Sequence, residues 1–350
     1  RDVVRYVGEP VAAVAANHPD TCRRALAAIV VEYEVLEPLT EPEDAVDGSH
    51  PPIHPDGNVI RHQRIVRGDQ TIEGPVVVEG TYELGMQDQA FLGLEAALAV
   101  PDPGGAGVEL HVATQWLHED RKQIATVLGL PEEQVVIRYA AIGGAFGGRE
   151  DLSVQHLLAL AAWKLRRKVG IVWSREESIL AHHKRHPMHI RCTWGASQDG
   201  KITAVDAEFV ADGGAYASTS AEVTKVAALF ASGVYEVPNV RVIGNAVYTN
   251  NIPSGAFRGF GAPQAHFAAE SMVTRLAHAI RMDPVEFRRR NIYREGSIEP
   301  TQQPLPSGVS ALTVLDRCVE EAKRRCGGTR LDGAPDPERP WVRRGIGIAA

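Results

Sequence analysis

Residues 143–151, Gly-Gly-Ala-Phe-Gly-Gly-Arg-Glu-Asp, constrain this chain more than any other stretch. Glycine lacks a Cβ, so a glycine pair on each side of Phe146 lets the backbone adopt positive φ and approach a ligand closely. Residues 134–139 before it read as a strand, and the apolar spacing after it predicts a helix that begins at Glu150. A glycine loop at a helix N-terminus presents free N–H groups to an anionic or oxo group. A tight turn without a ligand is the alternative.

The loop differs from the common nucleotide-binding motifs. It lacks the Gly-Lys-Ser/Thr ending of a P-loop, and its glycines do not follow the spacing of a dinucleotide-binding turn. A second loop of similar kind spans residues 253–264 and precedes a predicted helix over 264–279. Phe146 and Phe260, one in each loop, predict a slot for a planar molecule, because aromatic rings favour stacked or edge-on contacts. Core packing is the alternative for each ring.

A glutamine marks a third candidate position. Gln115 follows the predicted strand 108–113 and precedes a predicted helix over 118–128. Folds that alternate strands and helices place ligand contacts at such strand ends, although a glutamine there can also simply cap a helix. The junctions at Gln115 and Gly143 lie one strand–helix repeat apart, so one sheet could bring both to a single site.

Composition narrows the class of protein. The chain has 350 residues, 44% of them hydrophobic and 23% charged, which is enough for two or three packed units. Its net charge of −7 argues against nucleic acid or an anionic membrane as the main partner, and its apolar runs are too short to span a bilayer. The four cysteines contain no Cys-x-x-Cys pair, which fits a reducing cytoplasm and excludes a self-contained iron–sulfur or zinc-finger site.

Other segments carry weaker signals. Residues 1–45 alternate as strand, helix and strand, a small α/β unit that opens in mid-strand, so we expect the natural N-terminus to be missing. Residues 46–75 lack periodicity and read as a linker. His182, His183 and His186 flank Lys184 and Arg185; because like charges disfavour a cation site, we predict a surface or interface role for them.

Taken together, the two glycine-aromatic loops and Thr114-Gln115 resemble the molybdenum hydroxylases, the family of xanthine dehydrogenase and aldehyde oxidase. The resemblance covers essentially the whole chain in order, and residues 85–95 also look like bacterial xanthine dehydrogenase molybdenum subunits. It implies an α+β fold in which mixed sheets pack against helices. Its parts would be the latter part of a hammerhead domain (1–45), a linker (46–75), the first molybdopterin-binding domain (76–335) and the start of a truncated second one (336–350).

The resemblance also implies roles for single residues. Gln115 matches a glutamine that contacts molybdenum through an oxo ligand. Glu150 and Phe260 match residues that bind a purine. The remaining positions expected at the cofactor are Gly144, Ala145, Phe146, Gly147, Ala256, Phe257 and Arg258. No catalytic residue is assigned, because the family's base glutamate is expected beyond Ala350; Glu9, in a similar Gly-Glu-Pro sequence, lies in the small domain.

The activity implied is that of a xanthine dehydrogenase in purine catabolism. A purine such as xanthine or hypoxanthine would be hydroxylated with water as oxygen source, at a molybdenum–pterin cofactor that is molybdopterin or its cytosine dinucleotide. Electrons would pass to 2Fe-2S clusters and FAD on partner subunits of a cytoplasmic hetero-oligomer. Glu150 favours a purine because aldehyde oxidases usually carry an apolar residue there, whereas Val226 stands where a purine-binding arginine is expected, with only Lys225 beside it. The alternatives are hydroxylation of an aldehyde or another N-heterocycle, or an inert cofactor-binding fragment. The carbon monoxide dehydrogenases carry a cysteine in the second loop, and this chain has none there, so we exclude that branch.

Overall fold

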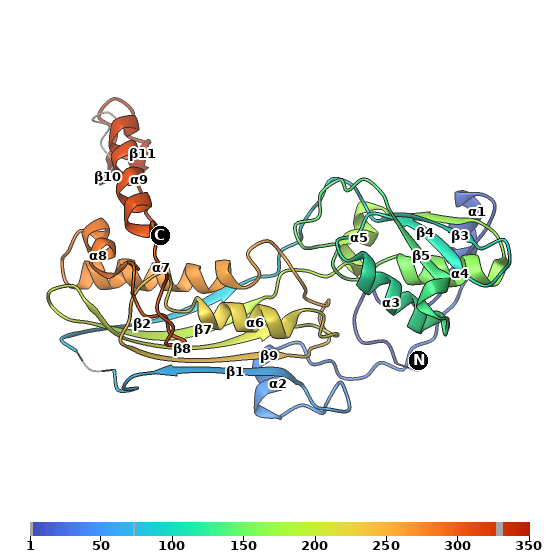
Figure 1. The fold of residues 1–350 in the computed structure, drawn as a ribbon, viewed down its shortest axis with the longest axis horizontal. Helices are drawn as coiled ribbons and strands as arrows, with labels where there is room; N and C mark the ends of the chain where they lie inside the picture. Colours follow the sequence, from blue (N-terminus) through green and yellow to red (C-terminus); the bar gives the residue numbers. More distant parts are fainter. Residues whose placement is uncertain (1–2, 73, 327–331) are drawn as a thin grey trace.

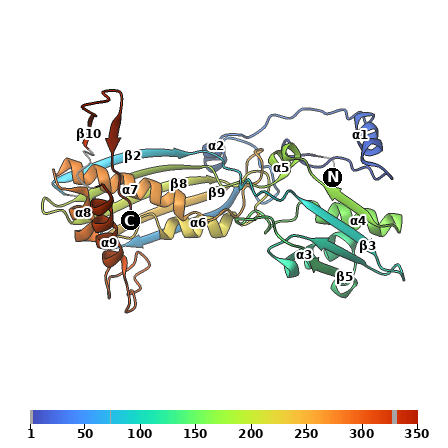
Figure 2. The same cartoon turned by 90° about the horizontal axis from the view of Figure 1, so that it is seen from above.

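The computed structural model describes residues 3–72, 74–326 and 332–350. The two larger β-sheets lie side by side, each with helices packed against it, and an extended N-terminal segment runs between them (Figures 1 and 2). The chain crosses from the larger sheet to the smaller through residues 85–95 and returns through residues 182–187. This mixed architecture agrees with the predicted α+β class.

The larger sheet has five strands in the order β1-β9-β8-β7-β2. β8 and β9 run parallel, and every other neighbouring pair is antiparallel. The predicted hairpin is present as β7 and β8, with Met188 opposite Ala211. The strands are β1 (Val59–Arg67), β2 (Val76–Leu84), β7 (Met188–Ala196), β8 (Ile202–Asp212) and β9 (Asn239–Val247).

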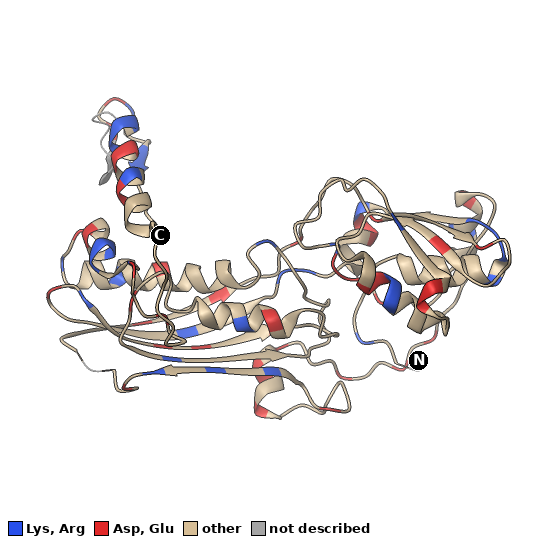
Figure 3. Ribbon diagram, in the orientation of Figure 1, with Lys and Arg blue, Asp and Glu red and all other residues tan. Residues whose placement is uncertain are grey.

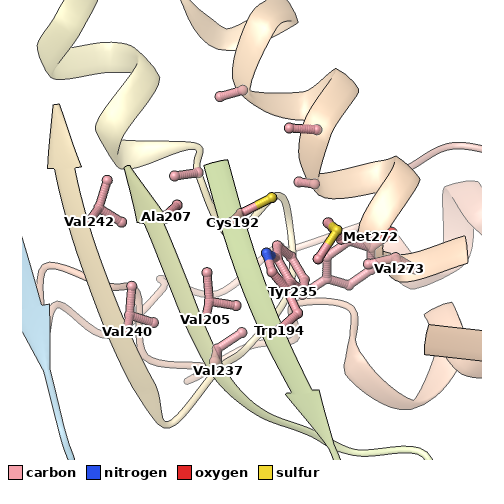
Figure 4. Packing of buried hydrophobic residues seen from close by; sticks show 14 of the residues in the cluster. Cys192, Trp194, Val205, Ala207, Tyr235, Val237, Val240, Val242, Met272 and Val273 are labelled. Carbon is pink, nitrogen blue, oxygen red and sulfur yellow. The ribbon is translucent and has the colours of Figure 1, made fainter. Parts of the chain in front are cut away.

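Helices α6 (Ser220–Leu229) and α7 (Ala262–Ala279) pack against this sheet and close its core (Figure 1). The core side chains alternate along the strands, as expected for a sheet with one buried face. Figure 4 shows Trp194 and Cys192 of β7 facing Met272 of α7, with Tyr235 beside them. Trp194, Tyr235 and Met272 are all fully buried, so this layer carries most of the apolar stabilisation of the larger unit.

The smaller sheet has four strands in the order β5-β4-β3-β6. β4 and β5 are parallel, whereas β3 is antiparallel to both of its neighbours. Two helices pack on it around a separate core that includes Leu110, Ile124 and Leu158. The elements are β3 (Ala96–Pro101), β4 (Val108–Val112), α3 (Leu117–Leu128), the 3-10 turn η1 (Glu132–Gln134), β5 (Val135–Tyr139), α4 (Gln155–Leu165) and β6 (Val169–Val172).

The remaining elements lie around the two sheets. α5 (Arg175–Ala181) begins with a capping box in which Ser174 and Glu177 bond each other's backbone N–H. The others are α2 (Pro42–Asp47), α8 (Pro284–Asn291), α9 (Ala311–Cys326), β10 (Asp332–Pro335) and β11 (Arg343–Gly345). Charges of both signs are interleaved along α3, α8 and α9 (Figure 3). Among the described residues, no helix combines the length and apolar character needed to cross a membrane.

The N-terminal segment differs from its prediction. Helix α1 (Pro19–Ala27) forms as expected, but the strands predicted on either side of it do not. Val7, Val30 and Val35 are 80%, 85% and 88% exposed. An alternating sequence becomes a strand only where a neighbour supplies hydrogen bonds and covers its apolar face, and no described residue does so here. The hammerhead domain therefore stays a prediction.

The segment predicted as a linker contains the edge strand β1, which pairs with β9 along its length. The sequence did not predict this strand, because the polar run Arg61-His62-Gln63-Arg64 interrupts the apolar alternation. These residues can be polar because the strand buries little more than Ile65. The pairing of β1 shows that regular structure in the larger unit begins before the predicted boundary at residue 76. Other domain boundaries remain predictions.

Candidate functional site

Gln115 and the first glycine loop (residues 143–148) meet at one edge of the smaller sheet. β4 and β5 are parallel neighbours, so the segments that leave their C-terminal ends emerge side by side. The Gln115 N–H donates to the Arg149 carbonyl at 2.9 Å, and the Arg149 N–H donates to Gln115 Oε1 at 3.1 Å. The structure thus brings together the two junctions that sequence reasoning linked.

The helix after this loop begins later than predicted. α4 starts at Gln155, so Glu150 and Asp151 lie in an irregular segment and not in its first turn. Gln155 Oε1 accepts the Ser153 N–H at 2.7 Å, which gives that donor a side-chain partner just before the helix. The dipole of α4 therefore does not act directly on residues 143–148, and that part of the sequence argument is wrong.

The first loop depends on unusual backbone angles. Gly144 and Gly147 have φ of 99° and 96°, and Phe146 between them has φ of 56°. Positive φ is rare for a bulky residue and marks local strain of the kind found at ligand sites. A Cβ on Gly147 would lie 2.7 Å from the Ala256 carbonyl oxygen, so only glycine permits this approach of the second loop.

The second glycine loop (residues 253–261) comes from the larger sheet and contacts the first directly. The Arg258 N–H donates to the Phe146 carbonyl at 2.9 Å. Phe260 has φ of 52°, and a Cβ on Gly261 would lie 2.4 Å from the Val223 carbonyl oxygen. Unlike the first loop, this one leads straight into a long helix, since α7 begins at Ala262. Phe146 is half exposed and Phe260 partly buried, so the loops present at least one open aromatic face.

The outgoing crossing, residues 85–95, supports both loops. Gln89 Nε2 donates to the Ala256 carbonyl at 2.8 Å, and the Gly93 N–H donates to the Gly143 carbonyl at 2.9 Å. The buried Arg149 guanidinium lies 4.3 Å from the centre of the Phe91 ring. From the sequence, residues 85–95 showed a resemblance to bacterial xanthine dehydrogenase molybdenum subunits but not these contacts, because long-range contacts leave no periodic pattern.

The histidine-rich segment lies in the interior, and its predicted place on the surface is wrong. His182, His183 and Lys184 are 3%, 6% and 2% exposed, and His186 is also buried. Burial lowers the pKa of His182 to about 3, and the neighbouring His183 adds to this effect. These histidines are therefore neutral packing groups near pH 7 and not part of a cationic surface. The segment has no apolar–polar alternation that would predict its burial, so only the structure shows that it lies in the interior.

Two carboxyl groups near the first loop have raised pKa values. Asp120 on α3 is fully buried; burial raises its pKa to about 6, against hydrogen bonds from Thr114 and Gln155. Burial also raises the pKa of Glu150, and the adjacent Asp151 contributes to this. Glu150 directly follows the first loop and is partly buried, so its carboxyl oxygens can accept hydrogen bonds from the N–H edge of a heterocycle.

Glu9 takes no part in this site. Its Oε1 accepts the Tyr216 hydroxyl at 2.6 Å and its Oε2 accepts the Arg5 N–H at 2.7 Å. Both oxygens are thus engaged in fixing the N-terminal segment. This arrangement agrees with leaving Glu9 out of the catalytic assignment.

The loops have the features that a pterin cofactor with oxo groups would require. Gln115 is exposed, and its Nε2 donates to no other residue in the described ranges, so this amide is free to donate to a ligand. Arg258, in the second loop, is also exposed, and it supplies a cation for a phosphate group. The glycines bring backbone N–H groups to the same place without side chains in the way. The residues present therefore fit such a group.

A separate pocket of about 610 Å³ lies away from the loops. It is bounded by Tyr82 of β2, by one face of α7 including Phe267 and Glu270, and by residues 348–350. None of the residues expected at the cofactor lines it. We therefore base the candidate site on the glycine loops, whose strained backbone and close contacts need a reason, and not on cavity size.

The chain matches one protein-family model and several known proteins. The model of the molybdopterin cofactor-binding domain matches residues 53–292. The chain is 40% identical to the nicotinate dehydrogenase large molybdopterin subunit of Eubacterium barkeri, over 92% of this chain and 76% of that protein. It is 38% identical to a probable xanthine dehydrogenase subunit of Bacillus subtilis, over 93% of this chain but only 45% of that protein. The aldehyde oxidoreductase structure from Desulfovibrio gigas superposes with a TM-score of 0.83 at 28% identity, covering 91% of this chain and 36% of that one.

Proposed function

This chain belongs to the molybdenum hydroxylases, in the part that binds the molybdopterin cofactor, and from this premise we propose that it serves an enzyme that hydroxylates a purine such as xanthine or hypoxanthine with water as oxygen source. The chain spans about three quarters of one curated relative and less than half of another. The activity of the whole enzyme is therefore part of the proposal.

The cofactor would be held by both glycine loops. Gln115 would donate from Nε2 to an oxo ligand of molybdenum, because its Oε1 is already engaged by Arg149. Backbone groups of residues 144–147 and 256–258 would surround the pterin and the metal, with the Arg258 side chain available to a phosphate. When bound, this cofactor supplies the redox chemistry, whether it is molybdopterin itself or its cytosine dinucleotide.

Glu150 is the single observation that carries the purine assignment. It lies within the segment that joins the first loop to α4, it is partly buried, and its pKa is raised by burial. A carboxyl group can accept hydrogen bonds from the N–H groups of a neutral purine. Leaving such a group without a partner costs about 1–3 kcal/mol, so a substrate without that edge would be disfavoured. Phe260 would pack against the ring.

Nicotinate and aldehydes are the competing substrates. Nicotinate carries a carboxylate, and Glu150 and Asp151 side by side near the first loop would repel it. An aldehyde group has no N–H or O–H that could donate a hydrogen bond to the Glu150 carboxyl group. The lack of a cation at Val226, which is partly buried in α6 with Lys225 exposed beside it, weakens purine binding relative to enzymes that have one.

The electrons released would leave through partner subunits that carry 2Fe-2S clusters and FAD, in a hetero-oligomer. The four cysteines of this chain, at positions 22, 192, 318 and 326, form no Cys-x-x-Cys pair, and Cys192 is buried in the core of the larger sheet. All four are free thiols, which supports the cytoplasmic location that we propose.

The test is a substrate comparison with the complete native complex that contains this chain. Dye reduction is measured with xanthine, nicotinate and an aromatic aldehyde, for wild type, Glu150→Gln and the exposed control Glu133→Gln. We expect xanthine to be preferred and Glu150→Gln to lower kcat/KM for xanthine by about 10- to 100-fold, because the amide has one acceptor oxygen where the carboxyl group has two, which leaves one purine N–H without a partner. Preference for nicotinate or the aldehyde, with Glu150→Gln without effect, would refute the purine assignment and leave the family intact.

A further inference from the structure

The return crossing, residues 182–187, is the most polar buried segment near the two glycine loops, and the proposed function assigns it no role. Lys184, at its middle, is 2% exposed although it carries an ammonium group. Burying a lysine costs free energy unless its ammonium group is paired, so the burial of Lys184 needs an explanation. The contacts of this segment point to one.

The segment holds the second glycine loop through its main chain. The Lys184 N–H donates to the Pro253 carbonyl at 3.0 Å, and the Gly255 N–H donates to the Lys184 carbonyl at 2.8 Å. The two stretches therefore pair like strands, with a parallel bridge at Ser254. Arg185 adds a hydrogen bond from Nη2 to the Arg258 carbonyl at 3.1 Å.

The same segment holds the first glycine loop through side chains. His182 Nε2 contacts the Gly148 carbonyl, so in its neutral form it carries the proton on Nε2 and donates there. His183 Nδ1 lies 3.3 Å from Asp151 Oδ2, and the two imidazole rings stack with centres 4.3 Å apart. The return crossing, residues 182–187, thus contacts both glycine loops.

The Lys184 side chain fixes this stretch to the rest of the site. Its Nζ lies 2.7 Å from Asp88 Oδ2, in the outgoing crossing, and donates to the carbonyls of His182 at 2.7 Å and Ser178 at 3.3 Å. A single ammonium therefore joins the outgoing crossing, the return crossing and the end of α5. The outgoing crossing in turn bonds both loops through Gln89 and Gly93.

We propose that Lys184 is a positioning residue: paired with Asp88, it holds the two glycine loops in the register that the molybdenum cofactor requires. This role rests on the proposed function for the identity of the cofactor, but not for the coupling between the loops. Lys184 is buried behind the loops, and it acts through the backbone of residues 182–186 and 253–255.

The experiment compares wild type, Lys184→Met, Asp88→Asn and the double variant in the purified complex, with the exposed Lys164→Met as control. Hydrogen–deuterium exchange is followed at residues 143–151, 253–261 and, as a reference, the β7–β8 hairpin. The molybdenum content is measured after gel filtration. In the fraction that keeps the metal, the Mo(V) electron paramagnetic resonance signal is recorded, because a mere loss of folded protein would scale that signal without shifting it.

We expect Lys184→Met to raise exchange at least tenfold in both glycine loops while the hairpin stays protected, to lower bound molybdenum severalfold, and to shift the resonance signal. Asp88→Asn, which keeps the lysine and its carbonyl contacts, has the same effects to a smaller degree, and the double variant recovers part of the loss because no unpaired carboxylate remains. Unchanged exchange, or faster exchange in one loop only, overturns the proposal. If the wild-type complex holds no molybdenum, the proposed function fails, and the exchange data alone still decide the positioning role.

Discussion

The buried carboxyl group of Asp120 makes the stability of this protein depend on pH in a direction that can be calculated. Asp120 is fully buried on α3, behind Gln115, and burial raises its pKa from 3.8 to about 6. The folded state therefore binds the proton more tightly than the unfolded state does. The folded protein loses stability as pH rises from about 3.8 through 6, and the loss is complete above that range.

The magnitude follows from the size of the shift. A difference of about two pKa units corresponds to about 3 kcal/mol at 25 °C. Asp120→Asn keeps the shape of the side chain and an oxygen for the Gln155 amide, which lies 3.4 Å from Asp120 Oδ2, but it cannot ionise. We expect the variant to gain up to about 3 kcal/mol over wild type at pH 8 and a gain near zero at the acid end of the window, pH 4.

Urea unfolding followed by tryptophan fluorescence at a series of pH values from 4 to 8 measures this difference. Asp56→Asn, at an exposed position, serves as control and should track wild type throughout. A free-energy difference between Asp120→Asn and wild type that stays flat across the series would show that Asp120 is ionised in the folded protein at low pH, and would refute the burial argument.

Two further predictions concern packing. Gly147→Ala should lower both the melting temperature and the molybdenum content, because its Cβ would meet the Ala256 carbonyl. The control Gly57→Ala has a similar positive φ, but its Cβ would meet nothing within 4 Å, so it should cost only about 1–2 kcal/mol of backbone strain. Equal effects of the two substitutions would exclude the clash as the cause. Met272→Ala should destabilise the larger unit by about 2–5 kcal/mol in chemical unfolding, since this fully buried side chain fills the layer between α7 and the sheet. A cost below about 1 kcal/mol would mean that neighbouring side chains move in to fill the cavity.

Sequence reasoning succeeded where the physics is local. The hairpin of β7 and β8 and the strand–helix order that joins Gln115 to the first loop follow from apolar alternation and turn residues, which a short window contains. It failed where a distant partner decides the outcome. β1 is a strand because β9 pairs with it, and His182 is buried because it packs against Phe91 and the Gly148 carbonyl, both distant in the chain. The start of α4 was misplaced for a local reason, since the side chain of Gln155 accepts the Ser153 N–H just before the helix.

The candidate site shows the same division. Glycine pairs and aromatic residues identify both loops from the sequence alone, and the structure adds how they are held. The support from Gln89, Lys184 and Arg185 consists of hydrogen bonds between residues far apart in the chain. Such contacts leave no spacing that a single sequence can display, which is why these residues were missed or assigned elsewhere.

The glycine contacts have a consequence for how such a scaffold diverges. At Gly93, Gly147 and Gly261 the nearest atoms are main-chain atoms, so contacts between backbone segments set the shape of the two loops. Side chains that face the substrate can then be exchanged without altering that shape. Under the function proposed above, a laboratory search for new substrate ranges should vary Glu150 and leave these glycines untouched, since their contacts fix the positions of the two loops.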